Sequence, residues 1–190
     1  MRLVFATNNK HKLDEARQIL GNQVELLSLK DVGIHEDIPE DYPTLEDNSR
    51  QKAQYIFDKY GYDCIADDTG LEINALDGEP GVYSARYAGE PPSPAANRHK
   101  VLQKMTGIAD RTARFRTVVT LITNGNVWQT EGIVRGRIEE QEKGDGGFGY
   151  DCLFTPEGYD LTFAQLGAET KNSISHRAKA MQNLALHLQK

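Results

Sequence analysis

The chain has 190 residues, of which 38% are hydrophobic and 26% are charged, so it can bury a core as one domain or as two closely packed lobes. Its 22 basic and 28 acidic side chains leave a net charge of −6, which argues against polymeric nucleic acid as a partner, because such binding needs a basic face. No stretch is apolar enough to span a membrane and the N-terminus does not resemble a signal peptide, so we expect a cytoplasmic protein without a membrane partner.

Apolar residues in the first third of the chain switch between strand-like and helix-like spacing. Thr44, with Asp47 three residues later, is a good helix N-cap, and Gly61 is a good end for the helix that it starts. The elements predicted here are, in order, a strand over 3–6, a helix over 10–20, a strand over 24–29, an acidic loop over 31–43, a helix over 45–60, a strand over 63–67 with a turn at its end, and a strand over 71–76.

The remainder of the chain combines one strong hairpin signal with glycine-rich loops. Asn124-Gly125 is typical of a two-residue hairpin turn, and Ser93 followed by Pro94 is typical of a helix start. The elements predicted here are a long loop over 76–93, a helix from 94 to about 105, strands over 114–123 and 127–138, a glycine-rich loop that feeds a strand near 154, and a last helix from about Ser175. Together the elements predict a mixed α/β protein with a partly antiparallel sheet.

The polar stretch TNNKHK lies between the first strand and the first helix. A short loop at this place presents free backbone N–H groups and the positive end of the helix dipole, and both favour an anion. Thr7, Asn8 and Asn9 add hydroxyl and amide groups, while Lys10 and Lys12 add positive charge. The stretch therefore predicts a phosphate-binding corner, although it lacks the glycines of known phosphate loops. The alternative is an asparagine cap followed by solvated lysines.

Two adjacent carboxylates, Asp67 and Asp68, close the strand in the stretch IADDTGL. Because side chains alternate along a strand, only one of them should point into a given cleft. A carboxylate at such a place is a natural ligand for Mg²⁺, and it can also take a proton from water. The alternative is an aspartate that caps a turn through Thr69 and Gly70.

Two further stretches carry candidate binding residues. In GDGGFGYD, glycines surround Phe148, and an aromatic ring in such a loop can stack on a nucleobase. The alternative is a tight turn that places Phe148 in the core. In TKNSISHRAKA, we expect Lys171, His176 and Arg177 at the start of the last helix, where the helix dipole disfavours cations unless an anion or a carbonyl oxygen compensates. The alternative is three solvated surface residues.

The stretches TNNKHK, IADDTGLEI, GEPGVYSARYAG, GGFGYD and SHRAKA, in this order, resemble the inosine triphosphate pyrophosphatase family over residues 3–188. Its members hydrolyse dITP, ITP and XTP to the monophosphate and pyrophosphate with Mg²⁺. The resemblance implies a single nucleoside-triphosphate pyrophosphatase domain over 1–190. It also implies an elongated, two-lobed α/β fold with a mixed sheet, an active site in the central cleft, and a homodimer.

The resemblance also implies roles for individual residues. Asp68 corresponds to the residue that binds Mg²⁺ and accepts a proton from the attacking water. We assign the second metal-binding acid to Glu40, with Glu36, Asp37 and Asp41 as close competitors. The implied substrate-binding residues for the triphosphate are Thr7, Asn8, Asn9, Lys10, His11 and Lys12. Thr69 would bind substrate through its side-chain hydroxyl. Phe148, Gly149, Tyr150 and Asp151 are implied for the base and sugar, and Lys171, His176 and Arg177 for the purine edge.

Other functions share part of these features. A pyrophosphatase for modified pyrimidines, or for all nucleoside triphosphates, would keep the phosphate corner and change the base loop. A nucleotide sensor would bind without cleaving, but it has little need for a base beside a metal, so the aspartate pair argues against it.

Overall fold

Three long strands, β3 (Cys64–Ile73), β5 (Thr112–Thr123) and β6 (Asn126–Ile138), run through the fold, which is a computed structural model that describes residues 1–190. Each of these strands contributes residues to both of the two compact units into which the chain divides. Unit 1 comprises Met1–Asp68, Thr117–Gly132 and His176–Lys190, and unit 2 comprises Thr69–Arg116 and Ile133–Ser175.

The sheet mixes parallel and antiparallel pairs, as predicted. Hydrogen bonds link the strands in the order β2-β1-β3-β5-β6-β7, and β4 (Pro80–Gly81) pairs with β3. In unit 1, β1 (Arg2–Phe5) is parallel to β2 (Glu25–Leu27) and to β3. In unit 2, β4 is antiparallel to β3, and β7 (Phe154–Pro156) is antiparallel to β6.

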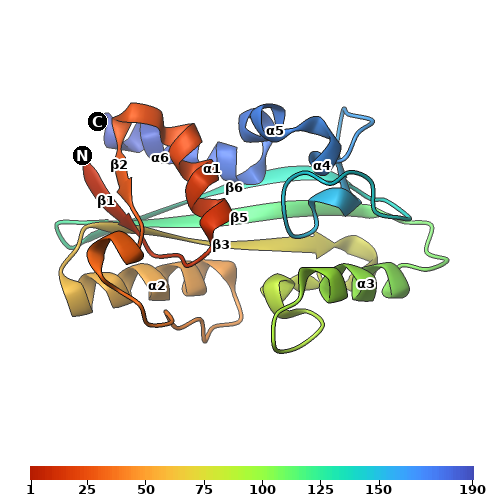
Figure 1. Cartoon of the computed structure of the whole chain (residues 1–190), viewed down its shortest axis with the longest axis horizontal. Coiled ribbons are helices and arrows are strands. Elements are labelled where there is room, and N and C mark those ends of the chain that lie inside the picture. Colours follow the sequence, from red (N-terminus) through yellow and green to blue (C-terminus); the bar gives the residue numbers. More distant parts are fainter. The chain divides into compact units, whose positions relative to one another are not determined.

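Unit 1 buries apolar side chains on both faces of its strands. Helices α1 (Lys10–Leu20) and α6 (His176–Leu188) cover one face and pack against each other, whereas α2 (Leu45–Tyr60) covers the other (Figure 1). Leu3, Phe5 and Ile65 point toward α1 and α6, while the alternate residues Val4 and Ala66 point toward α2. Strand alternation therefore decides which helices a given β3 side chain meets.

Local signals fix the ends of the helices where the sequence placed them. The Thr44 hydroxyl accepts a hydrogen bond from the Asp47 backbone N–H at 3.1 Å, which caps α2. Gly61 ends α2 in the left-handed conformation, with φ of 73°. Asn124 and Gly125 both have positive φ, which is the backbone that a tight hairpin between β5 and β6 requires.

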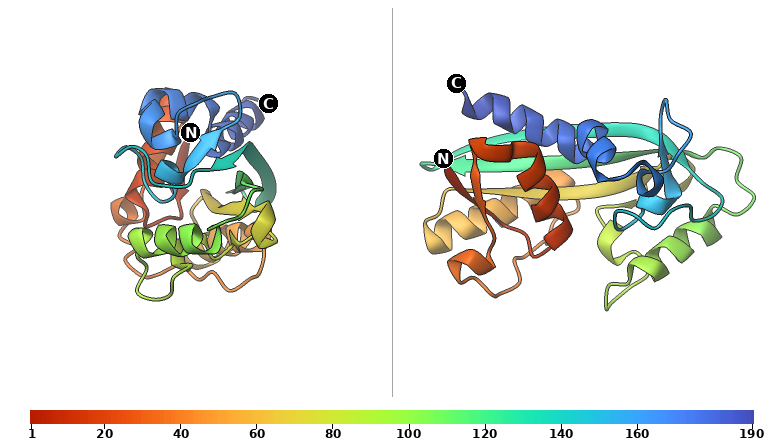
Figure 2. Two further views of the ribbon diagram at one scale, coloured as in Figure 1. Left: turned by 90° about the vertical axis from the view of Figure 1, so that its right-hand side faces the viewer. Right: turned by 45° about the horizontal axis from the view of Figure 1, so that its top comes forward.

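Unit 2 has one apolar core on one face of its strands. Helices α3 (Pro94–Lys104) and α4 (Phe163–Leu166) both contribute to this core, which contains Phe115 of β5 and Val134 of β6 (Figure 2). Helix α5 (Ala168–Ile174) follows α4 directly along the chain. The sequence did not predict α4 and α5, because four and seven residues are too few to show a helical period.

The predicted turn after Asp67 is wrong, because β3 continues without a break from Cys64 to Ile73. Gly70 is not a turn residue. A Cβ atom on Gly70 would lie 2.7 Å from the carbonyl oxygen of Gly81, so glycine is needed where β4 approaches β3. Asp68 consequently does not cap a turn.

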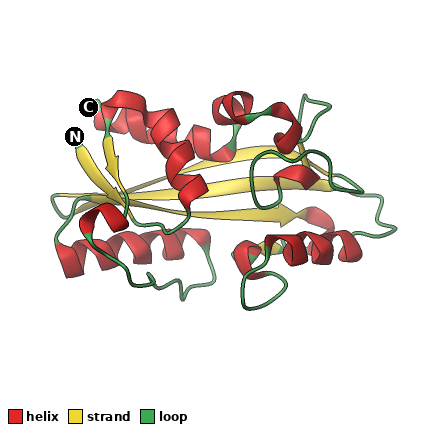
Figure 3. Ribbon diagram, in the orientation of Figure 1, coloured by secondary structure: helices red, strands yellow, loops and turns green.

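The placement of Lys171 also differs from the prediction. Lys171 lies in α5, and Ser175 separates α5 from α6 with an extended backbone. Only His176 and Arg177 begin the last helix. Both chain termini lie in unit 1 (Figure 3). None of the helices combines the length and the apolar composition that crossing a membrane requires.

The thiol of Cys64 should not react with thiol reagents in the folded protein. Its side chain is buried, it donates to the Ala53 carbonyl oxygen at 3.2 Å, and burial raises its pKa to about 12. Because the thiolate is the nucleophile, the Cys152→Ser variant should not react with a disulfide reagent at pH 8 until it is unfolded in guanidinium. Absorbance of the released thiolate measures the reaction, and rapid labelling of the folded variant would contradict the buried position.

Candidate active site

The two aspartates of β3 lie on opposite faces of the strand, as the alternation of side chains predicted. Asp67 points toward α1 and α6, where it meets Lys12 and Arg177. Asp68 lies on the α2 face, where the charge of Lys52 acts on it. Asp67 is fully buried and Asp68 is 7% exposed.

Asp67 is the centre of a buried charge network, which we call the Asp67 network. Its Oδ1 atom accepts from Lys12 Nζ at 3.2 Å, and its Oδ2 atom accepts from Arg177 Nε at 3.4 Å. The Arg177 guanidinium, 1% exposed, also donates to the Glu15 carboxylate. The network therefore joins α1, β3 and α6 and contains two cations and two carboxylates.

The pKa values in this network follow from burial and charge together. Burial alone would raise the pKa of Asp67, but Lys12 and Arg177 outweigh it and hold the pKa of this carboxyl below its usual range. Burial lowers the pKa of Lys12, and Asp67 opposes that effect. Arg177, a cation at the start of α6 that the helix dipole disfavours, thus has the anionic partners that its position needs.

The pKa of Asp68 is shifted in the opposite direction from that of Asp67. Burial raises the pKa of Asp68 to about 6, Lys52 opposes the rise, and the nearby charge of Glu40 adds to it. Lys52 is itself buried and pairs with the Glu40 carboxylate. Although burial disfavours its charge, Asp68 and Glu40 raise the pKa of Lys52 above its ordinary value. Asp68, Lys52 and Glu40, which we call the Asp68 group, form a second charged cluster in unit 1.

Lys52 is a site residue that the sequence reasoning missed. It lies on the buried face of α2, in line with Ser49, Ala53 and Ile56. A lysine on the apolar stripe of an amphipathic helix is a signal that could have found it, because lysine is rarely buried without a partner. Glu15, on a half-buried position of α1, offered no such signal.

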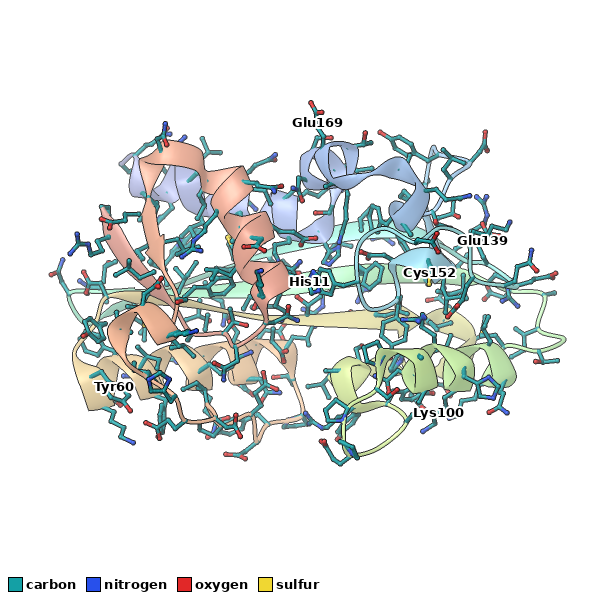
Figure 4. All side chains as sticks on the ribbon, in the orientation of Figure 1. His11, Tyr60, Lys100, Glu139, Cys152 and Glu169 are labelled. Carbon is teal, nitrogen blue, oxygen red and sulfur yellow. The ribbon has the colours of Figure 1, made fainter.

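The predicted phosphate corner is an exposed loop with one partly buried cation, Lys12. Asn9 caps α1 by accepting from the Lys12 backbone N–H at 3.2 Å, and the Asn9 N–H donates to the Thr7 hydroxyl at 3.1 Å. Asn8, Asn9, Lys10 and His11 are exposed, and His11 lies at the N-terminal end of α1 (Figure 4). The asparagine-cap alternative is correct for Asn9, but Lys12 is not a solvated lysine.

Glu40 and its three competitors for the second metal-binding role have different surroundings, and the role itself stays a prediction. Glu36 accepts hydrogen bonds from Lys59, Tyr55 and Tyr60, which hold its pKa at about 2. Tyr60 lies at the C-terminal end of α2 (Figure 4). Asp41 accepts from Gln51 at 2.7 Å. Asp37 is exposed. Only Glu40 shares a cation with Asp68.

The residues present fit a magnesium ion that is completed by substrate. Mg²⁺ is usually held by one or two carboxylates together with phosphate oxygens and water, and not by an all-protein cage. The Asp68 group supplies two such carboxylates, Asp68 and Glu40, and no cluster of three acidic, histidine or cysteine ligands exists in the chain. Lys52 pairs with Glu40, and its charge also acts on Asp68.

Five of the predicted residues lie together in unit 2, where they form the base-loop group: Phe148, Gly149, Tyr150, Asp151 and Lys171. Thr69 lies on β3 in unit 2, and His176 is buried at the start of α6 in unit 1. The Asp151 carboxylate accepts from Lys171 Nζ at 2.6 Å and from the Phe148 N–H at 3.0 Å. Lys171 Nζ also lies 4.6 Å from the centre of the Phe148 ring. A Cβ atom on Gly147 would lie 2.2 Å from the Asp151 carboxylate, so this glycine permits the loop to fold onto it.

The base-loop group is anchored from both sides. Arg98 donates to the Gly149 carbonyl oxygen at 3.0 Å, and the Tyr150 hydroxyl donates to the Ser84 carbonyl oxygen at 2.6 Å. Tyr150 is buried, and burial raises its pKa. Phe148 and Thr69 are half-buried. Phe148 is therefore a ring held in place by its neighbours yet still partly accessible.

A hollow of about 470 Å³ in unit 2 contains none of the predicted residues. It lies over β5 and β6 and is lined by Asn74, Thr112, Ala113, Arg114, Arg135, Gly136, Arg137, Thr155, Glu157 and Gly158. Its arginines project from the face of the strands opposite the apolar core. The chemistry predicted from the sequence lies elsewhere, in the two clusters of unit 1 and the base-loop group.

The mixed sheet, the loop that opens α1, and the paired carboxylates and lysines define the class of α/β proteins that act on phosphate groups. Residues 3–187 match the Ham1 family. The dITP/XTP pyrophosphatase of Flavobacterium johnsoniae is 50% identical over 184 residues, which cover 97% of this chain and 96% of the relative. That of Porphyromonas gingivalis is also 50% identical over 184 residues, covering 96% of this chain and 95% of the relative.

Solved structures agree with these relatives. A HAM1 protein from Coxiella burnetii matches with a TM-score of 0.91 at 33% identity, and the Staphylococcus aureus Ham1 protein matches with 0.89 at 36%. Each alignment covers 100% of this chain and 98% of the other. The chain belongs to the Ham1 family, which confirms the resemblance found in the sequence.

The Asp67→Asn substitution should destabilise unit 1 strongly, because it leaves Lys12 and Arg177 buried without the carboxylate between them. Breaking a buried ion pair in this way costs about 3–5 kcal/mol in the free energy of unfolding. Urea unfolding followed by circular dichroism measures the change. Asp31→Asn is the matched control, since Asp31 lies at the same 3.2 Å from Arg17, but with both side chains nearly half exposed. Equal losses for the two variants would contradict the buried network.

Proposed function

We propose that this protein hydrolyses the nonstandard purine nucleoside triphosphates dITP, ITP and XTP to the nucleoside monophosphate and pyrophosphate, and so clears deaminated purines from the nucleotide pool. Relatives that are 50% identical over nearly their whole length carry the name dITP/XTP pyrophosphatase. The observation that carries the proposal is the Asp68 group, in which a buried carboxyl with a pKa of about 6 lies beside a lysine and a second carboxylate.

Charge stabilisation is the first contribution of the chain. A nucleoside triphosphate carries about four negative charges, and phosphoryl transfer is catalysed mainly by positioning and by charge stabilisation. We assign the triphosphate to the loop from Thr7 to Lys12, whose backbone N–H groups open α1. Lys12 brings a cation held by Asp67, and Lys52 brings a second cation held by Glu40.

Proton transfer is the second contribution. Asp68 accepts a proton from water as the water oxygen bonds to phosphorus at the α–β bridge. The bond from that phosphorus to the bridging oxygen breaks, the bridging oxygen keeps the electron pair, and pyrophosphate and the monophosphate separate. In the metal-free protein burial raises the pKa of Asp68, which favours proton uptake by this carboxylate, while a bound Mg²⁺ would act in the opposite direction. Mg²⁺, held by Asp68 and Glu40 together with the phosphates, would supply further neutralisation of charge.

We assign base recognition to the base-loop group and to the start of α6. The half-buried Phe148 ring offers a stacking surface, and Asp151 holds Lys171 beside it. Hypoxanthine and xanthine carry a 6-oxo acceptor, which suits donors from His176, Arg177 and backbone N–H groups. Guanine shares this acceptor, so its rejection must come from the 2-position. Adenine presents a 6-amino donor, which leaves such donors unpaired at a cost of about 1–3 kcal/mol for each buried group.

Arg177 has a second task that the sequence did not suggest. Its guanidinium donates to Asp67 and Glu15, so at least part of its donor set holds the Asp67 network together. Its role at the purine edge stays a prediction. The proposal also retains Mg²⁺ as the cofactor, a cytoplasmic location and a homodimer.

The substrate panel tests the proposed activity directly. Pyrophosphate release with Mg²⁺ at mildly alkaline pH should be at least about a hundredfold greater in kcat/KM for dITP, ITP and XTP than for dATP, dGTP and dTTP, a gap of roughly 2.7 kcal/mol. Equal rates with all six would favour the broader pyrophosphatase and contradict the base assignment. Binding of ITP without any release of pyrophosphate would favour the sensor.

The Asp68→Asn substitution tests the proton acceptor. It should lower kcat by about 10²–10⁴-fold, because asparagine cannot take the proton, while ITP binding with Mg²⁺ is largely kept. Calorimetric titration measures binding, and pyrophosphate release measures turnover. Asp58→Asn, on the exposed side of α2, is the control for the same chemical change. Full turnover by Asp68→Asn would remove Asp68 from the mechanism.

A further inference from the structure

Helix α6 contacts β6 at three successive places within unit 1. Near its C-terminal end, the His187 ring stacks on the Trp128 ring with the centres 4.0 Å apart. In its middle, Asn183 Nδ2 donates to the Thr130 hydroxyl at 3.3 Å. At its N-terminal end, the backbone of α6 meets Gly132. Because Trp128, Thr130 and Gly132 are two residues apart, they share one face of β6.

The contact at Gly132 is far closer than an ordinary side chain allows. A Cβ atom on Gly132 would lie 2.0 Å from the carbonyl oxygen of His176 and 2.6 Å from the backbone nitrogen of Ala180. These atoms belong to residues i and i+4, which bond to each other in the first turn of an α-helix. Both belong to backbone, so no rotation of a side chain could relieve the clash. Any residue other than glycine must push the start of α6 away from β6.

The start of α6 is also where the Asp67 network is attached to this helix. Arg177 directly follows His176, and its guanidinium contacts Asp67 and Glu15. Asp67 in turn holds the ammonium of Lys12. The backbone contact at Gly132 therefore sets the distance between β6 and the first turn of α6. Arg177 extends to the network from that turn.

The sizes of the side chains along β6 differ between the two ends of α6. The largest one, Trp128, separates the C-terminal end of α6 from the strand, whereas Gly132 lets the N-terminal end touch it. Packing alone would be satisfied by a uniform distance along the helix. The close backbone contact at Gly132 lies at the end of α6 that carries Arg177.

We propose that Gly132 is a positioning residue for the reaction: it allows the first turn of α6 to touch β6 and thereby places Arg177 against Asp67, which fixes Lys12. Gly132 touches no substrate in this proposal and acts through Arg177. The activity readout rests on the function proposed above, and the spectroscopic readouts do not.

The Gly132→Ala variant tests this assignment by activity. Displacement of reacting groups by about 1 Å can cost 10²-fold, so kcat/KM for ITP should fall by about tenfold to a hundredfold. The effect should largely disappear in an Arg177→Lys background, because residues that act through one another are not additive. Gly136→Ala is the matched control on the same strand, since its Cβ atom would lie 2.2 Å from the Thr155 carbonyl oxygen. Its effect should add to that of Arg177→Lys.

Two spectroscopic readouts separate a shifted first turn from a helix that has come loose. Trp128 is the single tryptophan, so its fluorescence reports only the C-terminal contact with His187 and should stay unchanged in Gly132→Ala. The Nε–H resonance of Arg177 should shift in Gly132→Ala. That of Arg111, whose Nε donates to the Ile138 carbonyl oxygen at 2.7 Å, should not.

A conservative variant covers the case in which Gly132→Ala does not fold. Trp128→Phe loosens the other end of α6, and the proposal expects it to leave the Arg177 resonance and kcat/KM unchanged. A loss of activity in Trp128→Phe would overturn the proposal, as would additive effects of Gly132→Ala and Arg177→Lys or an unshifted Arg177 resonance. Absence of pyrophosphate release by the wild type would instead defeat the proposed function, while the resonance and fluorescence outcomes would still decide the role of Gly132.

Discussion

The arrangement of unit 1 depends on a fully buried carboxylate, that of Asp67, with Lys12 on one side and Arg177 on the other. Leaving any one of these charges alone in the interior costs several kcal/mol, so the three positions are tied to one another. Because the residues come from β3, α1 and α6, the same electrostatic constraint aligns two helices with the strand between them. The loop that precedes α1 thereby lies beside the ammonium of Lys12, which Asp67 holds in place.

Because side chains alternate along β3, the neighbouring residues Asp67 and Asp68 lie in different environments. Asp67 is surrounded by cations that keep it ionised, so it serves as a structural anion. Asp68, one residue further, is buried on the other face with fewer compensating charges, and its pKa rises to about 6. Two identical side chains thus acquire different protonation behaviour from burial and neighbours alone. In that second environment Lys52 offsets only part of the rise in the pKa of Asp68, and Glu40 adds to the rise.

The sequence predicted those features that local physics decides. The cap at Thr44, the end at Gly61 and the hairpin at Asn124-Gly125 all follow from residues next to one another in the chain. It failed where the reason is distant. Gly70 looked like a turn residue, but it is glycine because β4 passes close to it. The short helices around Lys171 have no period to detect, and their place depends on tertiary packing.

The candidate site shows the same division between local and distant causes. Motif resemblance singled out Asp68, Lys12 and Arg177, but it could not say that Arg177 is committed to Asp67, because that contact joins residues 110 positions apart. A buried arginine with two carboxylate partners is held in one conformation, whereas a solvated arginine samples many. Any donor that Arg177 offers to a base is consequently pre-oriented by Asp67 and Glu15. In the proposed role of Arg177 at the purine edge, substrate binding would then require less ordering of that side chain, and the network that stabilises unit 1 would also contribute to affinity.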